Sequence, residues 1–262
     1  MQTELSSASQ TQLKKWARLT ETKARRAEGV FLVEGVKVVE ELLSSDGQTE
    51  AILVLPEKIK DWEGLVDKAD NNIPIYSIPR SQWKKLSQDK EPEGIMAVVQ
   101  IKPELDWTTF LSTRPGNTLI LHETNNPGNV GALMRSALWF GFSNIILSAN
   151  SADYTNPKTV RASMGSLFHL TIVSDVDLRE ALPQIKKHHY LVGSDVRQGL
   201  PPRPLPQKAA LLLGSESHGL PEYLLAFADE RWCIPGNART DSLSLPQAAT
   251  IMMYEMGKRF KI

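Results

Sequence analysis

The chain has 262 residues, of which 41% are hydrophobic, so it is long enough to bury one large core or two ordinary ones. Its one cysteine, Cys233, excludes a disulfide framework, and the polar N-terminus with no run of about 18 apolar residues predicts a soluble, cytoplasmic protein that does not enter a membrane. The chain has 30 basic residues (lysine and arginine) and 30 acidic residues (aspartate and glutamate), so its formal net charge is zero. A net charge of zero argues against a nucleic-acid partner only if the charges are spread evenly along the chain.

Positive charge is concentrated near the N-terminus. Residues 14–26 contain one acidic residue, Glu21, and six basic residues: Lys14, Lys15, Arg18, Lys23, Arg25 and Arg26. Such a cluster suits contacts with phosphates, but the solvated face of a helix has the same composition. Charge alone leaves both interpretations open.

The first part of the chain predicts an α/β unit over residues 1–102. A helix-forming stretch at about residues 9–28 precedes a short apolar strand, Phe31 to Val33, and a helix should follow through Val39 and Leu43. Helices expected near residues 62–68 and 81–88 then alternate with the strands AILVLP, IPIYSI and GIMAVVQIK. Pro103 and Pro115 lie in a stretch without a sustained strand, which predicts a linker at 103–116.

Residues 117–262 predict a second unit, a mostly parallel sheet with helices on both faces. The apolar strands are TLILHE, NIILS, HLTIVS, HYLVGSDV, AALLLGSE and RWCIPG. Helices are expected between the first four of them, from about Val130 to Phe140, across Pro157 to Leu167 and over DLREALPQIKK. A last helix is expected from about Ser242 to Arg259, with an apolar stripe wide enough for core and subunit contacts. Ligands of open parallel sheets bind beyond the carboxyl ends of the strands, so the loops after TLILHE, AALLLG and RWCIP form the candidate site.

The first of these loops, Thr124 to Gly128, leads into a helix expected from about Val130 to Phe140. It lacks G-x-G-x-x-G and G-K-S/T, so a dinucleotide site and a P-loop are not supported. Polar amides and glycines at the start of a helix can nevertheless hold an anion through free backbone N–H groups.

The second and third loops carry polar side chains that other enzyme classes also use. Ser215 and His218 lie outside a G-x-S-x-G elbow, which disfavours acyl transfer, and the scattered histidines with one cysteine predict no metal site. In the third loop, Asp241 or Ser242 could cap the last helix, with Pro246 in its first turn. Capping explains the ends of this loop but not its long polar middle.

Taken together and in order, the three segments resemble the signature motifs of the SpoU (TrmH) family of SPOUT-class RNA 2′-O-ribose methyltransferases, over about Asn125 to Met256. The family's N-x-G-x-x-x-R is matched by Asn129, Gly131 and Arg135, and its G-x-E-x-x-G by Gly214, Glu216 and Gly219. Its I-P…S-L-N element is matched by Ile234, Pro235, Ser242 and Leu243. Ser244 departs from the pattern, because the family usually has asparagine there.

The N-terminal half resembles the family's substrate-binding domain, R-x-x-x-G-x-F-L-V-E-G, through Lys23, Arg25, Arg26, Gly29, Phe31 and VEGVKVVEELL. The resemblance implies a smaller, ribosomal-protein-like α/β RNA-binding domain at 1–102, followed at 117–262 by a parallel-sheet methyltransferase domain with a trefoil knot. It also implies a homodimer. RNA contacts would come from Lys23, Arg25, Arg26 and Arg135.

The implied reaction is methyl transfer from S-adenosylmethionine to a ribose 2′-hydroxyl of RNA, ribosomal RNA being favoured over transfer RNA. By resemblance the cofactor would be held around Leu213, Gly214, Ile234, Leu243 and Ser244, and the catalytic residues would be Asn129, Arg135, Glu216 and Ser244. A guanidinium is a cation with five donor hydrogens and no acceptor, so holding phosphate and stabilising the emerging alkoxide suits Arg135 better than removing a proton.

Three alternatives stay open. Ser244 in place of asparagine supports a catalytically inactive RNA-binding protein of the same fold, although serine still donates and accepts hydrogen bonds. A transfer-RNA ribose methyltransferase has the same motifs. A base methyltransferase of related knotted fold is disfavoured, because Asn129 with Arg135 resembles the ribose-modifying branch.

Overall fold

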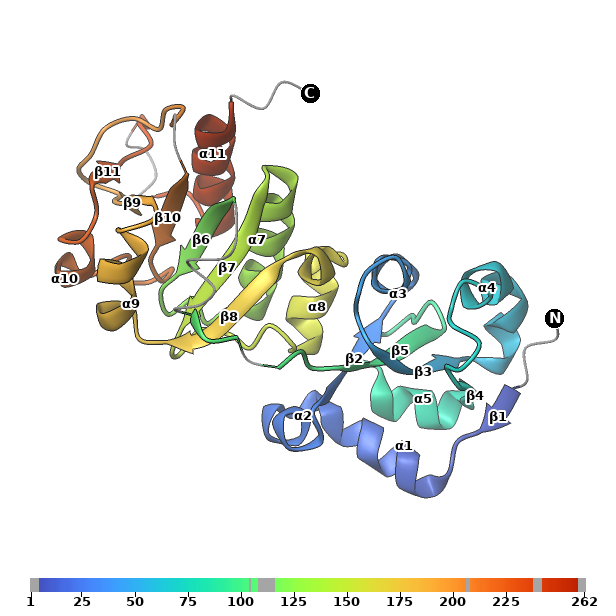
Figure 1. Cartoon of the computed structure of the whole chain (residues 1–262). Coiled ribbons are helices and arrows are strands. Elements are labelled where there is room, and N and C mark those ends of the chain that lie inside the picture. The colour runs from blue at the N-terminus through green and yellow to red at the C-terminus, as the bar shows by residue number, and fades with distance from the viewer. Residues whose placement is uncertain (1–4, 104, 108–115, 206–207, 238–241, 259–262) are drawn as a thin grey trace. The chain divides into compact units, whose positions relative to one another are not determined.

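The computed structural model describes residues 5–103, 105–107, 116–205, 208–237 and 242–258, and its contacts divide the chain into two compact units (Figure 1). The first unit comprises Met1–Pro103 with Asp153–Phe168, and the second comprises Glu104–Ala152 with His169–Ile262. Most of the predicted linker lies outside the described residues. The predicted domain boundaries stay a prediction, to which the structure adds that Asp153–Phe168 packs with the N-terminal residues.

The sheet of the first unit contains the predicted strands. It is built from β1 (Leu5–Ser7), β2 (Val30–Glu34), β3 (Thr49–Val54), β4 (Ile75–Ser77) and β5 (Ile95–Gln100), in the order β1-β4-β3-β5-β2. β5 runs antiparallel to both of its neighbours, and the other pairs are parallel. β1 was beyond sequence prediction, because three exposed residues show no apolar alternation.

The helix predicted over residues 9–28 is instead two helices, α1 (Gln10–Ala17) and α2 (Thr22–Glu28), joined by a 3-10 turn. Ser9 caps α1 by accepting from Gln12 N (3.2 Å), and extended backbone at Glu21 interrupts the helix. Gly29, at φ 67°, ends α2 in the left-handed region that glycine tolerates. The other helices are α3 (Val36–Leu43), α4 (Ile59–Val66) and α5 (Arg80–Leu86).

The segment that joins the first unit from later in the chain forms α8 (Pro157–Ser163) and a 3-10 turn, Ser166–His169. Asn156 caps α8 by accepting from Lys158 N (2.9 Å). α8 packs against β2, which is an edge strand of the first sheet. Covering an edge strand in this way protects its unpaired backbone groups from other chains.

The second unit is the predicted parallel α/β layer. Its strands are β6 (Asn117–Leu121), β7 (Phe142–Ser148), β8 (Thr171–Val176), β9 (Tyr190–Ser194), β10 (Ala209–Leu213) and β11 (Glu230–Trp232). Their order is β11-β9-β10-β6-β7-β8, and every pair is parallel. Every residue of the central strand β10 is buried, as expected for a sheet covered on both faces.

Helices cover both faces of this sheet. α9 (Leu178–Ile185) and α10 (Glu222–Leu225) share a core with Ile120, Ala210 and Leu212. α7 (Pro127–Trp139) and α11 (Leu245–Gly257) pack side by side, and α7 also contacts β7 while α11 contacts β10 (Figure 1). None of the helices in the described ranges is long and apolar enough to cross a membrane.

Candidate active site

The first motif segment starts α7. Asn126 caps the helix, because its Oδ1 accepts from Gly128 N (2.9 Å) and Asn129 N (3.3 Å), and Pro127 takes the first helical position. The helix therefore begins three residues before the predicted Val130, a start that the sequence signalled by an asparagine followed by proline. Asn129 lies half-buried in the first turn, and Arg135 lies exposed further along the helix.

The carboxyl end of β6 contributes residues that the motif comparison missed. His122 N donates to Leu213 O (2.8 Å), which ties the end of β6 to the end of β10. Burial lowers the pKa of His122, and nearby Glu123 only partly opposes this. His122 Nδ1 and Thr124 Oγ1 are buried and have no hydrogen-bond partner in the described part of the chain. Unpaired buried polar atoms are uncommon, so this end of β6 is a place where a ligand or water is expected.

The second motif segment folds back on itself after β10. Gly219 N donates to Ser215 O (2.9 Å), closing a tight loop. A Cβ atom added at Gly214 would lie 2.1 Å from the carbonyl carbon of Gly219, a distance that two carbon atoms cannot adopt. Gly219 itself has φ 65°. The two glycines of the motif are therefore required by the shape of the loop.

A hydrogen bond joins the first and second motif segments. Asn129 Nδ2 donates to Glu216 Oε1 (2.6 Å), and the short distance is typical of a bond to a charged acceptor. The structure thus brings together two of the four predicted catalytic residues. No hydrogen bond joins Arg135 to either of them, although all three are described, and its exposed guanidinium is accessible to a ligand.

The third motif segment leads into α11, which begins at Leu245 and not at the predicted Ser242. Ser244 is the cap residue, and its backbone N and Oγ both donate to Gln247 Oε1, at 3.3 and 3.0 Å. Capping by Ser242 is therefore a wrong prediction, and Asp241 lies outside the described residues. The Ser244 hydroxyl, predicted to line the cofactor and nucleotide sites, already has a structural partner.

The predicted cofactor residues lie at the carboxyl ends of β10 and β11 and at the start of α11. Leu213 and Gly214 are buried at the end of β10, against which α11 packs. Ile234 is half-buried, and Leu243 is 44% exposed, which is unusual for a large apolar side chain. Apolar side chains beside backbone groups fit a ligand with a flat, apolar base. Among the described residues, no group of three or more histidine, cysteine, aspartate or glutamate side chains is placed to hold a metal ion.

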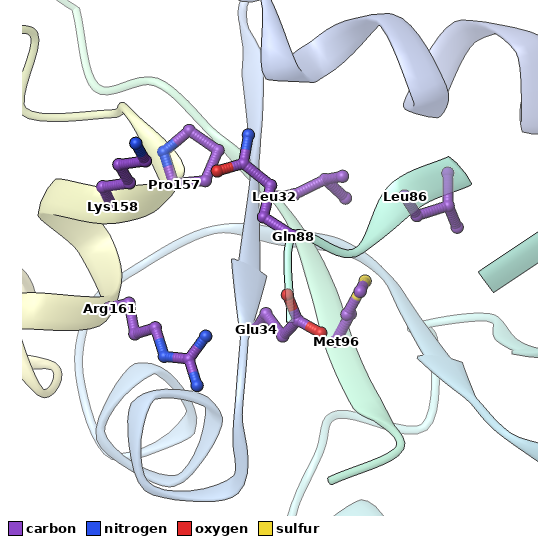
Figure 2. Close-up of a pocket in the computed structure, with 8 residues that line it drawn as sticks. All are labelled: Leu32, Glu34, Leu86, Gln88, Met96, Pro157, Lys158 and Arg161. Carbon is purple, nitrogen blue, oxygen red and sulfur yellow. The ribbon is translucent and has the colours of Figure 1, made fainter. Parts of the chain in front are cut away.

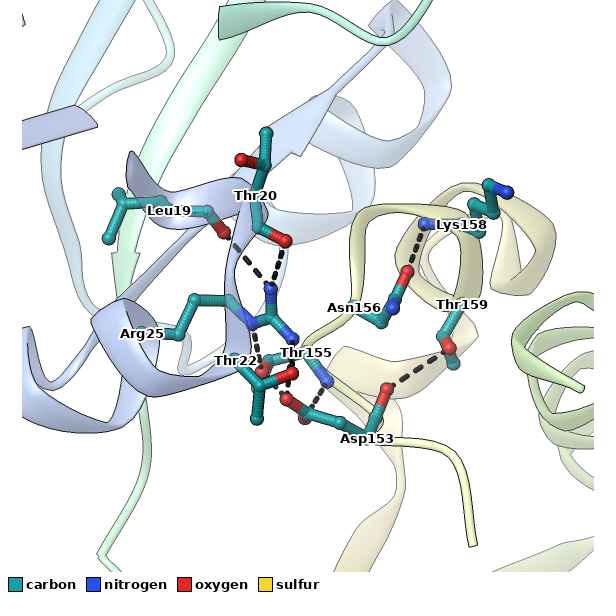
Figure 3. Close-up of polar contacts among 9 residues, drawn as sticks. All are labelled: Leu19, Thr20, Thr22, Arg25, Asp153, Thr155, Asn156, Lys158 and Thr159. Carbon is teal, nitrogen blue, oxygen red and sulfur yellow. Dashed lines mark hydrogen bonds and ion pairs between the residues drawn. The ribbon is translucent and has the colours of Figure 1, made fainter. Parts of the chain in front are cut away.

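Of the predicted RNA-binding residues on α2, Lys23 and Arg26 are exposed and Arg25 is fully buried. Figure 3 shows Arg25 surrounded by acceptors. Its five donor hydrogens are used by Thr155 Oγ1 (2.9 Å), Leu19 O and Thr20 O (3.0 Å each), Thr22 Oγ1 (2.9 Å) and Asp153 Oδ2 (2.6 Å). The prediction that Arg25 contacts RNA is wrong, because no donor is left for a phosphate.

Asp153 is the ionic partner of Arg25, and its side chain is 16% exposed. Burial by itself would raise the pKa of Asp153, but hydrogen bonds from Thr155 and Arg25 outweigh this effect and hold the pKa below its usual value. The carboxylate therefore stays charged. Arg25 and Asp153 attach the segment that precedes α8 to α2.

Comparison with known protein families assigns the chain to a family. Residues 116–254 match the model of the SpoU rRNA methylase family. The chain belongs to this family. Residues 10–97 match the MRM3-like substrate binding domain, so the SpoU domain follows a substrate-binding domain, as the resemblance implied.

Individual relatives agree with this assignment. The chain is 29% identical to the 23S rRNA (guanosine(2553)-2′-O)-methyltransferase RlmP of Bacillus subtilis, over 97% of this chain and 98% of the relative. A crystal structure of an RNA 2′-O ribose methyltransferase is 27% identical, covers 96% of both chains and has a TM-score of 0.80. The SpoU methyltransferase AviRb of Streptomyces viridochromogenes, in complex with AdoMet, is 24% identical over 96% of this chain and 98% of AviRb, with a TM-score of 0.84, and shows a shared fold.

Proposed function

We propose that this SpoU family member transfers a methyl group from S-adenosylmethionine to a ribose 2′-hydroxyl of ribosomal RNA. The observation that carries the proposal is the Asn129–Glu216 hydrogen bond, which joins two motif segments at the carboxyl edge of the parallel sheet. Ribosomal RNA is favoured over transfer RNA because the Bacillus subtilis relative is named for methylating 23S rRNA.

The cofactor site of this proposal consists of Leu213, Gly214, Ile234 and Leu243, with Ser244 at its edge. Support comes from AviRb, which has the same fold and holds AdoMet in its crystal structure. When bound, the cofactor supplies an electrophilic methyl group. The exposed Leu243 side chain gives an apolar surface for the adenine. The trefoil knot of the family is part of the same proposal.

The protein side of the reaction is assigned to three residues. Arg135 holds the phosphate beside the target ribose and stabilises negative charge on the 2′-oxygen as its proton leaves. Asn129 and Glu216 position the nucleotide, since their mutual hydrogen bond fixes both side chains before RNA binds. Ser244 fixes the start of α11 through Gln247, and any contact with the nucleotide uses the lone pairs left on its hydroxyl.

The proposal includes a homodimer and an RNA-binding first unit, in the cytoplasm. Apolar side chains exposed on α7 and α11 support the dimer: Trp139 is 83% exposed, and Ile251 and Tyr254 are also exposed. On α2, the RNA contacts of this proposal come from the exposed Lys23 and Arg26, without the buried Arg25.

The test is to incubate ribosomal RNA with the protein and S-adenosylmethionine, digest the RNA with nucleases and identify the methylated nucleoside. A 2′-O-methylated nucleoside is expected. A base-methylated nucleoside would assign the chain to base modification. RNA binding without methylation would support the inactive RNA-binding protein. The specific observation in favour of that alternative is Ser244, which replaces the family's asparagine and uses its hydroxyl to cap α11.

A further inference from the structure

A hollow of about 170 Å³ lies within the first unit, and none of the residues that line it belongs to the motif loops. Figure 2 shows its lining, with Lys158 and Arg161 of α8 on one side, apolar side chains on the other, and Glu34 with Gln88 between them. The apolar floor is formed by Leu32 of β2, Leu86 of α5 and Met96 of β5. All three floor residues are buried. An apolar floor beside polar and cationic groups suits an unstacked nucleobase with its phosphate.

One wall of the hollow is held in place by Arg25. Its bonds to Asp153 (2.6 Å) and Thr155 (2.9 Å) fix the chain immediately before α8, and α8 carries Lys158 and Arg161. Arg161 pairs with Asp89, whereas Lys158 is exposed and has no ion pair among the described residues. Lys158 is therefore the cation available to a phosphate.

Glu34 has acceptor capacity that the protein does not use. Its carboxyl group accepts from the Ser87 hydroxyl and from the backbone of Gln88, and a carboxylate can accept about four hydrogen bonds. Burial raises the pKa of Glu34, and the charge of Asp89 adds to this, while the Ser87 hydrogen bond and Arg161 act in the opposite direction. A ligand that donates hydrogen bonds would stabilise the charged carboxylate.

We propose that this hollow binds an unpaired guanine of the substrate RNA. Guanine has two adjacent N–H donors on its Watson–Crick edge, which together match one carboxylate. Uracil and cytosine place acceptors beside their donor, and adenine has one amino group beside an acceptor, so a carboxylate repels part of each edge. Gln88 donates to the guanine O6, and Lys158 contacts the adjacent phosphate. The identity of the RNA as substrate rests on the proposed function.

The test uses two single-stranded RNA pentamers, UUGUU and UUAUU, titrated into the full chain while the methyl signals of Leu32, Leu86 and Met96 are followed by NMR. UUGUU is expected to shift these signals and to bind at least about fivefold more tightly than UUAUU, the lower limit for one bidentate base contact. Glu34→Gln should reduce this preference to less than about twofold. Glu63→Gln, an exposed residue on α4, is the matched control and should leave the preference unchanged.

Two further variants separate base recognition from folding and from charge. Gln88 is exposed, so Gln88→Ala keeps the test valid if Glu34→Gln does not fold, and it should also weaken the preference for UUGUU. Lys158→Ala should weaken both pentamers by the same factor, because it acts on phosphate. Equal binding of the two pentamers, a preference that survives in both Glu34→Gln and Gln88→Ala, or unshifted floor methyl signals would overturn the proposal.

The pentamer measurement requires no methyl transfer, so it is independent of the proposed function. A chain that selects UUGUU at this hollow and methylates no RNA would overturn the methyltransferase proposal and leave the guanine site. A chain that methylates ribosomal RNA and binds both pentamers with equal affinity would overturn the guanine site and leave the methyltransferase proposal.

Discussion

Arg25 gives a quantitative prediction, because all its donors are used inside the first unit. Arg25→Met removes the cation and leaves Asp153 charged with a side chain only 16% exposed, together with the carbonyl groups of Leu19 and Thr20. Breaking a buried ion pair from one side typically costs about 3–5 kcal/mol. We expect local opening of the first unit to become more favourable by that amount.

Hydrogen–deuterium exchange measures this opening locally, which suits a chain of two units better than one unfolding curve. Amides of α2 and of the segment before α8 should exchange about 150-fold to 5,000-fold faster in Arg25→Met, since each 1.4 kcal/mol is tenfold. Arg26→Met is the matched control, because Arg26 is exposed on the same helix, and it should change stability by less than about 0.5 kcal/mol. Equal exchange in Arg25→Met and wild type would refute a role for Arg25 in holding the segment.

The ion pair between Arg25 and Asp153 also predicts that the stability of the first unit decreases as the pH is lowered. The folded pKa of Asp153 is depressed, so its contribution to stability is fully present above the unfolded pKa of about 3.9 and is lost as the pH falls through the folded pKa. The gap in exchange protection between wild type and Asp153→Asn should therefore be constant from pH 7 to about pH 5 and should close below about pH 4. A gap that persists at lower pH would contradict the charged state assigned to Asp153.

Other substitutions test the site and the RNA surface. Asn129→Ala and Glu216→Ala should each lower the methyl-transfer rate about fivefold to tenfold, and the double variant should be little worse, because the two residues act through one hydrogen bond; additive losses would show independent roles. Ser244→Asn should keep or raise the rate and preserve the helix cap, whereas Ser244→Ala should lose about fivefold; an unchanged rate in Ser244→Ala would leave Ser244 with capping alone. Replacing Lys23 and Arg26 together with alanine should weaken RNA binding and flatten its salt slope by about 1 to 2; an unchanged slope would remove them from the phosphate contacts.

The sequence was most informative where residues close together in the chain form one feature. Long apolar strands, the parallel sheet and the three motif segments were predictable, because alternation, turn residues and spacing are local signals. α10 and β1 were missed because four or three residues do not show a period. The start of α7 was misplaced although Asn126 and Pro127 signalled it.

Contacts between distant residues were beyond sequence reasoning. Arg25 lies in a basic cluster, and its burial depends on Asp153 and Thr155, which are 128 and 130 residues further along the chain. The same holds for the guanine hollow, whose lining comes from β2, α5, β5 and α8. The Asn129–Glu216 bond is intermediate, since the motifs identified both residues and only the fold joined them.

The most direct test of the central claim is single-turnover methyl transfer to ribosomal RNA by wild type and Arg135→Ala, with cofactor affinity measured on both. Removal of one group that stabilises developing charge typically costs about 100-fold to 1,000-fold in rate. Arg135 is exposed on α7 and lies outside the residues assigned to the cofactor, so S-adenosylmethionine should bind both proteins equally. A variant that keeps more than about a tenth of the wild-type rate would contradict the assignment of Arg135 to the reaction.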